Sequence, residues 1–361
     1  MRPSFWNLPV KVFILLASVV CLSVPNSSFA ASGGNGKTKL EVGSFNIQVF
    51  GESKFNKPFV RQTILSIISR YDIVFIQEIR DDQNKAIFAL LKELNLATGR
   101  DYHALVSDRM GRGEMKEQYA YFFDSKLVKA VDSYVFKDTV DDFAREPYVA
   151  RFSSLGREFT LAGIHVAPND VRTELRALSK VHRDVTQRFK DNNLLIMGDF
   201  NADCVYYKPV EGFDFFDEPV KVLVHDDEDT TVSPASCAYD RVLGFGPFLK
   251  FVSDAKPFNF QEQFNYDLAS AKLISDHYPV EFTIDALADY TSDEGVEPEA
   301  DGVIPAVVLS PEPEVTPIVI PAEVVSTPQL CGLTPYLTPG GYCYSSFEDG
   351  KVRVPDSCCS Y

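Results

Sequence analysis

Residues 37–289 alternate between short runs rich in Val, Ile, Phe and Tyr and longer amphipathic stretches, and this alternation limits the chain to a layered fold. Side chains of these types fit the pleated surface of a strand. We expect strands at 40–50, 72–79, 102–107, 119–123, 159–166, 194–200, 241–245 and 279–284, and helices at 58–70, 83–94 and 171–190. Strand runs separated by helices predict one α/β layered domain over 37–289.

Residues 1–30 have the features of a secretory leader. Arg2 and Lys11 precede an apolar run over 12–24, and a small-residue pattern ends at Ala30. This arrangement predicts a signal peptide that is cleaved after Ala30. The apolar run is short for a membrane span, which disfavours the alternative of an uncleaved anchor. We therefore expect a secreted protein with no stable membrane insertion.

Charge and cysteine content constrain the partner and the compartment. The 361-residue chain carries 35 Lys and Arg against 51 Asp and Glu, a net charge of −16, and loss of a leader with two bases would make it −18. Because an acidic protein is repelled by nucleic acid, DNA binding would need a local site and metal cations. Six of the seven cysteines follow the leader, and an even number in an exported chain predicts disulfides.

The composition changes after residue 289. Residues 290–328 repeat Pro, Glu, Val and Ser, as in PEPEVTPIVIP, which predicts an extended linker. Residues 329–361 hold four cysteines and are too few to form a core, so we expect a small disulfide-held module whose pairing is open. A disordered tail is the alternative. Eleven acids and two bases over 290–361 give a charge of −9, which disfavours direct DNA binding and leaves adhesion to a surface or glycan, or spacing.

Polar side chains recur where the expected strands end. They are Asn46, Glu78, His165, Asp199, Asn201, Asp240, Asp276 and His277. Each of them alone has an ordinary structural explanation, such as an Asn in a bulge or a Glu that caps a helix. A charged group at the end of a buried strand is costly unless it is paired or metal-bound. Several such groups in one domain therefore predict a shared site.

The residue types indicate the chemistry of that shared site. Carboxylate and amide oxygens are hard ligands suited to Mg²⁺, Mn²⁺ or Ca²⁺. The globular unit has no cysteine cluster typical of zinc, and no glycine-rich loop typical of NTP or NAD chemistry. Two histidines with carboxylate partners fit a general acid and a general base. Metal, acid and base together predict hydrolysis of a phosphoester.

Eight strings occur in the order of a known family: FNIQVFGESK, YDIVFIQEIRD, KEQYAYFF, FAREPYVARFSS, GIHVAPNDV, MGDFNADCVYY, CAYDRVL and SDHYPVEFT. They resemble secreted deoxyribonuclease I and its relatives in the endonuclease/exonuclease/phosphatase superfamily, over residues 38–286. GDFN and SDHYPV fix only the superfamily, whereas NADC, CAYDR and REP together are specific to the deoxyribonuclease I branch. The resemblance implies a four-layer α/β sandwich of two mostly antiparallel sheets with outer helices, and an active site at one edge of the sheets.

The resemblance also implies a set of catalytic and metal-binding residues. Glu78 and Asn46 would bind the catalytic Mg²⁺ or Mn²⁺. His165 would pair with Glu117, and His277 would pair with Asp240. The residues near the ion or the scissile phosphate would be Asp199, Asn201 and Asp276.

The implied substrate is DNA, cleaved endonucleolytically to leave 5′-phosphate ends. Arg145 and Tyr206 match phosphate-contacting positions, and Arg80 matches a residue that enters the minor groove. A structural disulfide would join Cys204 to Cys237. Structural Ca²⁺ would be bound at two family sites, one matched by Asp229, Thr231 and Ser233 and the other by Asp138, Asp141 and Glu146.

Several positions depart from the family pattern. Met115 stands where the family has a tyrosine that stacks in the minor groove, and methionine cannot stack as a flat ring does. Gln48 replaces a phosphate-directed arginine, and Ala235 replaces a threonine of the first calcium loop. The part of the chain after residue 289 has no counterpart in deoxyribonuclease I. We expect retained chemistry with an altered grip on duplex DNA.

Two other functions are open on sequence grounds. One is a secreted phosphodiesterase of the same superfamily that acts on a lipid, as a sphingomyelinase does, although Arg80, Arg145 and Tyr206 favour DNA. The other is a catalytically inactive secreted binding protein, which is disfavoured because every expected histidine and metal ligand is present. We expect a monomer.

Overall fold

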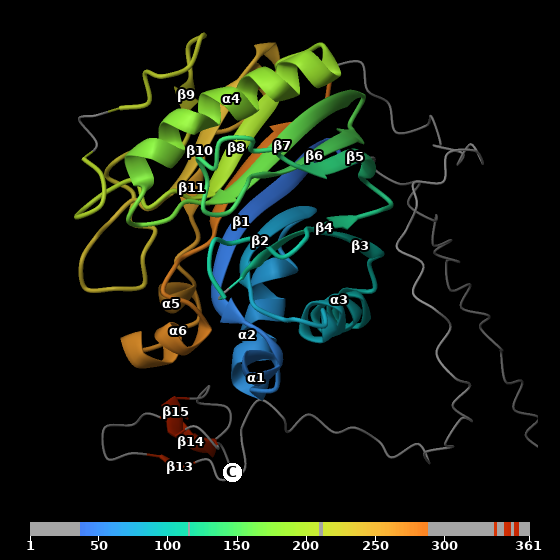
Figure 1. Ribbon diagram of the computed structural model, residues 1–361. Helices are drawn as coiled ribbons and strands as arrows, with labels where there is room; N and C mark the ends of the chain where they lie inside the picture. Colours follow the sequence, from blue (N-terminus) through green and yellow to red (C-terminus); the bar gives the residue numbers. More distant parts are fainter. Residues whose placement is uncertain are drawn as a thin grey trace, which may run out of the picture. The chain divides into compact units, whose positions relative to one another are not determined.

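The computed structural model describes residues 37–114, 116–208 and 212–287, together with three short strands near the C-terminus (Figure 1). The expected leader over 1–30, Met115 and the expected linker over 290–328 lie outside the described residues, so these domain boundaries stay predictions. In the part of the chain that is described, none of the helices has the length and apolar character that crossing a membrane requires.

The first of two six-stranded sheets is built around β1, a long strand near the N-terminus of the domain. Its strand order is β11 (Lys256–Pro257), β12 (Val280–Asp285), β1 (Lys39–Phe50), β2 (Ile73–Ile79), β4 (Gln118–Asp124) and β3 (Tyr102–Val106). Only β1 and β2 run parallel among these neighbours, and the other pairs are antiparallel. The carboxyl ends of β1 and β2 therefore meet at one edge of the sheet.

The second sheet has the same plan around its own parallel pair, β7 and β8. Its strand order is β5 (Lys129–Val135), β6 (Tyr148–Ser154), β7 (Arg157–His165), β8 (Leu194–Asp199), β10 (Asp240–Phe245) and β9 (Lys221–Val222). The other neighbours are antiparallel. The carboxyl ends of β7 and β8 again form one edge, and the antiparallel β10 begins at that edge.

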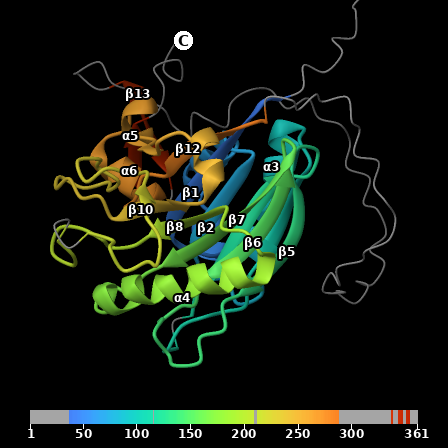
Figure 2. The ribbon, with the colours of Figure 1, turned by 90° about the horizontal axis from the view of Figure 1, so that it is seen from above.

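Helices cover the outer face of each sheet, which gives four layers (Figures 1 and 2). The helices are α1 (Glu52–Phe55), α2 (Pro58–Ile68), α3 (Lys85–Thr98), α4 (Val171–Phe189), α5 (Phe260–Gln263) and α6 (Leu268–Ile274), with a 3₁₀ turn, η2, over Pro247–Phe251. Buried side chains of α2, α3 and α6 pack on the first sheet, and those of α4 pack on the second. The four-layer α/β sandwich expected from the sequence is confirmed.

The layers explain why the central strands are apolar along their whole length. On β7, Leu161 faces the core between the sheets, whereas its neighbours Ala162 and Ile164 face α4. On β2, Phe75 faces the inter-sheet core, and Val74 packs toward the first helical layer. Successive side chains of a strand point to opposite faces. Because both faces of each sheet are covered, the side chains on either face of a central strand can be apolar.

All eight expected strands and all three expected helices are present, with ends that differ by a few residues. Sequence reasoning missed the strands β5, β6, β9 and β11 and the short helices α1, α5 and α6. Strand β5 has no fully buried residue, so it lacks the apolar run that identified the others. Strand β6 contains the buried Arg151, whose guanidinium is neutralised by Glu158 and Asp191, two residues that only the fold brings near.

The C-terminal segment contains a small antiparallel sheet of its own. Its strands are β13 (Tyr336–Leu337), β14 (Cys343–Phe347) and β15 (Gly350–Arg353), in that order. They fall within the module expected over 329–361. The pairing of the four cysteines there lies outside the described residues and stays a prediction.

Candidate active site

The strand register of the second sheet brings three of the expected residues together. Asp199 ends β8, and it pairs in register with His165 at the end of β7 and with Asp240 at the start of β10. Residues directly opposite one another on neighbouring strands place their side chains on the same face. Three polar side chains therefore line the edge where the parallel strands end, although they are far apart in the sequence.

The chain is sharply bent on both sides of Asp199. Gly198 has φ +140°, and a Cβ there would lie 2.0 Å from the carbonyl oxygen of Ile164, so only glycine fits. Asn201 has φ +48°, a left-handed conformation that asparagine tolerates better than most residues. Its backbone N–H donates to Asp199 Oδ1 at 2.9 Å. The GDFN string is thus a turn that fixes the orientation of the central carboxylate.

Irregular strand ends in the first sheet present two further residues to the same edge. The register between β1 and β2 shifts between Asn46 and Phe50, and the residues in the gap, Gln48 and Val49, have φ +44° and +52°. Glu78, near the end of β2, has φ +59°. Left-handed conformations are costly for a β-branched residue such as Val49 and are found where a functional site requires them. The bulge turns Asn46 toward Glu78, and their side chains are joined by a 3.1 Å hydrogen bond.

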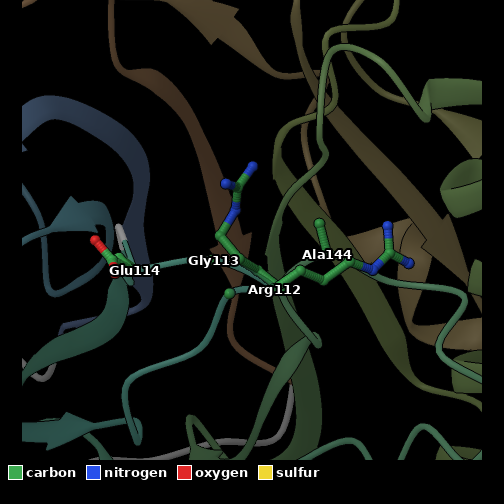
Figure 3. Close-up of a pocket in the computed structure, with 6 residues that line it drawn as sticks. Arg112, Gly113, Glu114 and Ala144 are labelled. Carbon is green, nitrogen blue, oxygen red and sulfur yellow. The ribbon is translucent and has the colours of Figure 1, made fainter.

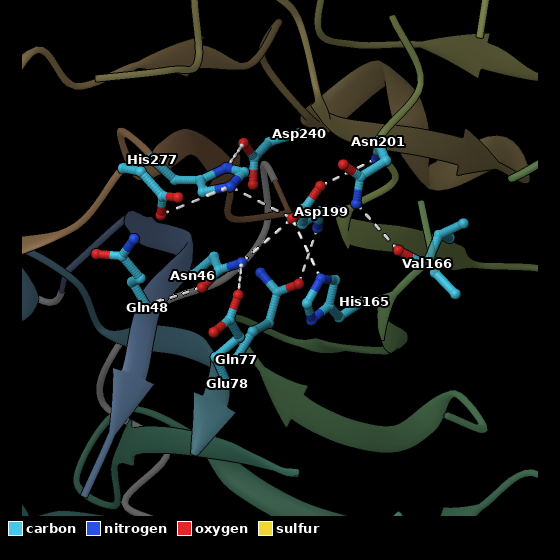
Figure 4. Close-up of polar contacts among 12 residues, drawn as sticks. Asn46, Gln48, Gln77, Glu78, His165, Val166, Asp199, Asn201, Asp240 and His277 are labelled. Carbon is cyan, nitrogen blue, oxygen red and sulfur yellow. Dashed lines mark hydrogen bonds and ion pairs between the residues drawn. The ribbon is translucent and has the colours of Figure 1, made fainter. Parts of the chain in front are cut away.

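Two histidine–carboxylate pairs converge on Asp199, and Figure 4 shows both imidazole rings beside it. His165 Nδ1 lies 2.9 Å from Glu117 Oε2, and His277 Nδ1 lies 2.8 Å from Asp240 Oδ2. The opposite nitrogen of each ring faces the same atom, Asp199 Oδ2, at 3.5 Å from His165 Nε2 and 3.4 Å from His277 Nε2. We call these pairs the Glu117 dyad and the Asp240 dyad. Their pairing is the one that the resemblance implies.

The Glu117 dyad lies in a positively charged environment. Arg80 Nη2 donates to Glu117 Oε1 at 2.8 Å, and Arg145 Nε lies 3.6 Å from Glu117 Oε2. Burial disfavours the charged form of Glu117, but the hydrogen bond and charge of His165, together with Arg145 and Arg80, lower its pKa to about 2. Glu117 is therefore an ionised carboxylate that fixes the orientation of the His165 ring.

The Asp240 dyad lies in a negatively charged environment. Burial raises the pKa of Asp240 to about 6, against the attraction of His277. Burial also opposes the charged form of His277, but the carboxylates of Asp240, Asp199 and Asp276 raise its pKa well above the usual value. Near pH 7 this pair is a carboxylate beside an imidazolium.

Several supporting residues were missed, and two of them have partners that are distant in sequence. The side chain of Gln77 accepts a hydrogen bond from the backbone N–H of Asp199 at 2.8 Å, and the hydroxyl of Tyr119 accepts one from the backbone N–H of His165 at 2.8 Å. Both contacts cross between the two sheets. The ammonium of Lys54 donates to the carbonyls of Ile47 and Gln48 at 2.7 and 2.6 Å, which holds the β1 bulge. Burial lowers the pKa of Lys54 to about 8, while Asp276 and Glu78 oppose the shift.

The donor set at this edge fits a hard divalent cation. Asp276 Oδ1 is buried and accepts no hydrogen bond within the described part of the chain, and it lies 4.0 Å from His277 Nε2. The ligand atoms of Asp199, Asp240 and His277 lie within 4.8 Å of one another, close enough to share an ion. Carboxylate oxygens grouped in this way repel one another unless a cation or a proton is present.

The residues expected to contact substrate surround the dyads. Arg145 Nε donates to the carbonyl of His165 at 3.1 Å, and Arg145 borders a cavity of about 490 Å³ that is also lined by Gly111, Arg112, Gly113, Glu114 and Ala144 (Figure 3). The ring of Tyr206 lies 5.6 Å from that of Tyr239, which lies 6.3 Å from the ring of His277. Arg80, expected to reach into a DNA groove, instead pairs with Glu117 here. Asn201 donates to the carbonyl of Val166 at 3.0 Å.

The expected calcium ligands form hydrogen bonds with one another at the first position and bind other groups at the second. Thr231 and Asp229 are held together by a 3.0 Å hydrogen bond, and the Ser233 hydroxyl donates to the carbonyl of Ala235 at 2.6 Å. At the second position Asp138 accepts the backbone N–H of Phe143 at 2.9 Å, and Asp141 is paired with Arg112 at 3.1 Å. Asp138, Asp141 and Glu146 do not form a cluster of ligand atoms within the described residues. Calcium binding stays a prediction at both positions.

A disulfide joins the loop after β8 to the segment before β10. It links Cys204 and Cys237, whose Cα atoms are 5.9 Å apart. Asp203, next to Cys204, accepts the backbone N–H of Ala238 at 2.8 Å. The covalent link therefore ties the segments that carry Asn201 and Asp240.

Comparison with known proteins places the whole domain in one family. A profile of the Endonuclease/Exonuclease/phosphatase family matches residues 43–277. Human Deoxyribonuclease-1 is 40% identical over 260 residues, which cover 68% of this chain and 92% of that protein. Mouse Deoxyribonuclease-1-like 2 is 36% identical over 268 residues, covering 72% and 96%.

Among solved structures, truncated TDP2 from Caenorhabditis elegans shares the fold, with a TM-score of 0.50 at 16% identity over 69% of this chain and 98% of that one. At this identity the likeness concerns the fold alone. The sequence identity to the deoxyribonucleases extends over nearly their whole length. The chain therefore belongs to the endonuclease/exonuclease/phosphatase family, in the branch of deoxyribonuclease I.

Proposed function

We propose that this protein is a secreted, divalent-metal-dependent endonuclease that hydrolyses DNA phosphodiester bonds and leaves 5′-phosphate ends. One observation carries the proposal. Two imidazoles, each held at Nδ1 by its own carboxylate, direct their Nε2 atoms to one oxygen of Asp199. The two nitrogens can be no farther apart than the sum of those two distances, so an acid and a base can both reach one phosphoryl group.

The two dyads have complementary tasks in this reaction. One imidazole accepts a proton from the attacking water, and the other protonates the leaving 3′-oxygen. The carboxylate behind each ring fixes its tautomer and stabilises its charged form. A bound Mg²⁺ or Mn²⁺, held by Glu78, Asn46 and Asp276, would neutralise charge on the phosphoryl oxygens in the transition state. Asp199 and Asn201 would orient the phosphate between the two rings.

Several features support DNA as the substrate rather than another phosphodiester. The relatives that match over nearly their whole length are named deoxyribonucleases. Arg145 and Tyr206 border the dyads, where a DNA backbone would pass. The overall charge of −16 disfavours non-specific binding to DNA, so binding in this proposal depends on the local arginines and on the metal.

The remaining parts of the proposal concern compartment and architecture. The leader-like residues 1–30 support secretion, and the Cys204–Cys237 disulfide is consistent with an oxidising compartment. We propose a catalytic domain over 37–289, a linker over 290–328 and a Cys-rich module over 329–361 that attaches the enzyme to a surface or glycan. Ca²⁺ would support the loops of the domain. A monomer suffices, since one chain supplies both dyads.

Digestion of supercoiled plasmid tests the function. We expect nicking in Mg²⁺, stimulation by added Ca²⁺ and no activity in EDTA, with ligatable 5′-phosphate ends. The same preparation should not release phosphocholine from sphingomyelin vesicles. Activity on the vesicles but not on plasmid would identify a lipid phosphodiesterase. Inactivity on both substrates, with intact folding, would favour a binding protein.

A further inference from the structure

Glu174 is a fully buried carboxylate that no step of the proposed reaction uses. It lies in the first turn of α4. Its Oε1 accepts the backbone N–H of Ala144 at 3.1 Å, and its Oε2 accepts the backbone N–H of Ala167 at 3.3 Å. Burial raises the pKa of Glu174 to about 7, against these two N–H donors, and a buried carboxyl group of either charge needs such partners to compensate for lost water. Each carboxylate oxygen thus holds a different loop.

These two loops carry residues of the active site. Ala144 immediately precedes Arg145, and Ala167 follows His165 by two positions. Arg145 and His165 are themselves joined, because Arg145 Nε donates to the carbonyl of His165 at 3.1 Å. Glu174 therefore completes a ring of contacts with Arg145 and His165. The ring holds the backbone next to Arg145 and the backbone next to His165 in fixed positions.

The guanidinium held by this ring has a donor available for a ligand. Arg145 Nη2 is buried and has no hydrogen-bond partner within the described part of the chain. Arg145 also borders the cavity of Figure 3. A buried, unpartnered N–H of an arginine is costly unless an anion completes its contacts.

An ordinary helix-terminal role does not account for Glu174. Acidic residues in the first turn usually stabilise a helix through its dipole or by capping its own N–H groups. The contacts of Glu174 instead go to Ala144 and Ala167, both outside α4. The carboxylate thus acts on the neighbouring loops.

We propose that Glu174 is a positioning residue that holds Arg145, relative to His165, in the geometry needed to grip the phosphate of the substrate. This inference rests on the proposed function. It assigns no contact between Glu174 and DNA. Its effect on catalysis passes through Arg145.

The test is a double-mutant cycle with Glu174→Gln and Arg145→Ala. Glutamine keeps the shape of Glu174 but places an NH₂ group against one of the two N–H donors, so one loop is released. We expect Glu174→Gln to lower kcat/KM for plasmid nicking by about 10- to 100-fold, the effect of a small displacement of a substrate-positioning group. The double variant should be no worse than Arg145→Ala alone, within about twofold.

Asp72→Asn is the matched control. Asp72 is also a fully buried carboxylate that accepts a backbone N–H, from Glu41 at 2.7 Å, but it precedes β2 at the end remote from Glu78. This variant should unfold at lower temperature and keep kcat/KM within about twofold. If Glu174→Gln does not fold, Glu174→Asp, which keeps the charge but is too short to reach both loops, takes its place in the cycle.

Binding of a short DNA duplex in Mg²⁺, measured in a His277→Ala background that does not cleave the duplex, gives a second readout that does not depend on catalysis. Loss of one phosphate contact lowers the slope of log K against log salt by about 1. We expect Glu174→Gln and Arg145→Ala to lower this slope equally. Losses of kcat/KM that multiply in the double variant, or an unchanged slope for Glu174→Gln, would overturn the inference. A wild-type protein that does not nick plasmid would instead refute the proposed function.

Discussion

The Glu117 dyad and the Asp240 dyad have nearly the same geometry but opposite electrostatic surroundings. Each carboxylate lies within 3 Å of its imidazole, and each ring faces Asp199 Oδ2. Burial opposes the charge of Glu117, but His165, Arg145 and Arg80 together lower its pKa. Carboxylates surround His277 and raise its pKa. The site is thus polarised, with a cationic half and an anionic half on either side of one point.

This polarity indicates what each half binds. A phosphate oxygen is attracted to Arg80 and Arg145, whereas the divalent cation of the proposed function is attracted to Asp276 and to Glu78, which lies 3.6 Å from Arg80. A bound metal and a phosphoryl group would therefore occupy neighbouring positions in the site. The two histidines are equivalent in geometry, but we expect them to differ in task.

Removal of either imidazole should have the largest effect. We expect His165→Ala and His277→Ala each to lower kcat for plasmid nicking by about 10²- to 10⁴-fold, the usual contribution of a general acid or base. His182→Ala is the control, because His182 is another buried histidine paired with a carboxylate, Glu218, but on α4. Near-normal nicking by either active-site variant would remove that dyad from the mechanism.

Neutralising Glu117 should cost more unfolding free energy than neutralising Asp240. Glu117→Gln removes the carboxylate that Arg80, Arg145 and His165 share, and breaking a buried ion pair in this way costs about 3 kcal/mol of unfolding free energy. Asp240→Asn should cost about 1 kcal/mol or less, because burial already disfavours the Asp240 charge. Urea unfolding of both variants at pH 7 measures the difference. Equal losses would contradict the polarity described above.

The pH dependence of stability should have opposite signs in the two dyads. The folded-state pKa of Glu117, about 2, is below its unfolded value, so its stabilisation is present above about pH 4.5 and is lost as the pH falls toward 2, by about 3 kcal/mol. The pKa of Asp240 is raised to about 6, so its contribution is largest below about pH 4 and is lost as the pH rises through 6.

Unfolding free energies of wild type, Glu117→Gln and Asp240→Asn between pH 2 and 7 measure these two contributions. The difference between wild type and Glu117→Gln should grow with pH. The difference between wild type and Asp240→Asn should shrink over the same interval. If both free-energy differences changed with pH in the same direction, the two carboxylates would have similar electrostatic environments.

The smallest expected effect concerns the grip on the duplex. Met115→Tyr restores a flat ring where the resemblance implies minor-groove stacking, and stacking on one base is worth about 1 kcal/mol. We expect kcat/KM for double-stranded DNA to rise about fivefold, with little change for single-stranded DNA. Met115→Leu, which adds no ring, is the control. Unchanged duplex kinetics would show that stacking is not what the chain lacks.

The sequence predicted the site better than it predicted the site's supports. Polar residues at the ends of apolar strands identified Asn46, Glu78, Asp199 and both histidines, because a strand that ends in a charge is unusual. The pairing of each histidine with its carboxylate came only from resemblance. Glu117 and Asp240 lie 48 and 37 residues from their partners, and no local pattern encodes such a distance.

The residues that position the active site have no recognisable pattern in the local sequence. Gln77 and Tyr119 lie within apolar runs and act on residues of the other sheet, so their role exists only after the sheets pack. Glu174 reads as a common first-turn acid of a helix until its partners are known. Strand β5 was missed for a related reason, since an edge strand without a fully buried residue gives no apolar run.

One measurement tests most directly whether the two dyads perform different proton transfers on one phosphodiester. A DNA substrate with sulfur in place of the scissile 3′-oxygen has a leaving group that departs without protonation, so it no longer needs the general acid. Single-turnover cleavage of this substrate by His165→Ala and His277→Ala should restore one variant to near wild-type rates and leave the other impaired. Rescue of both variants, or of neither, would contradict the assignment of one acid and one base.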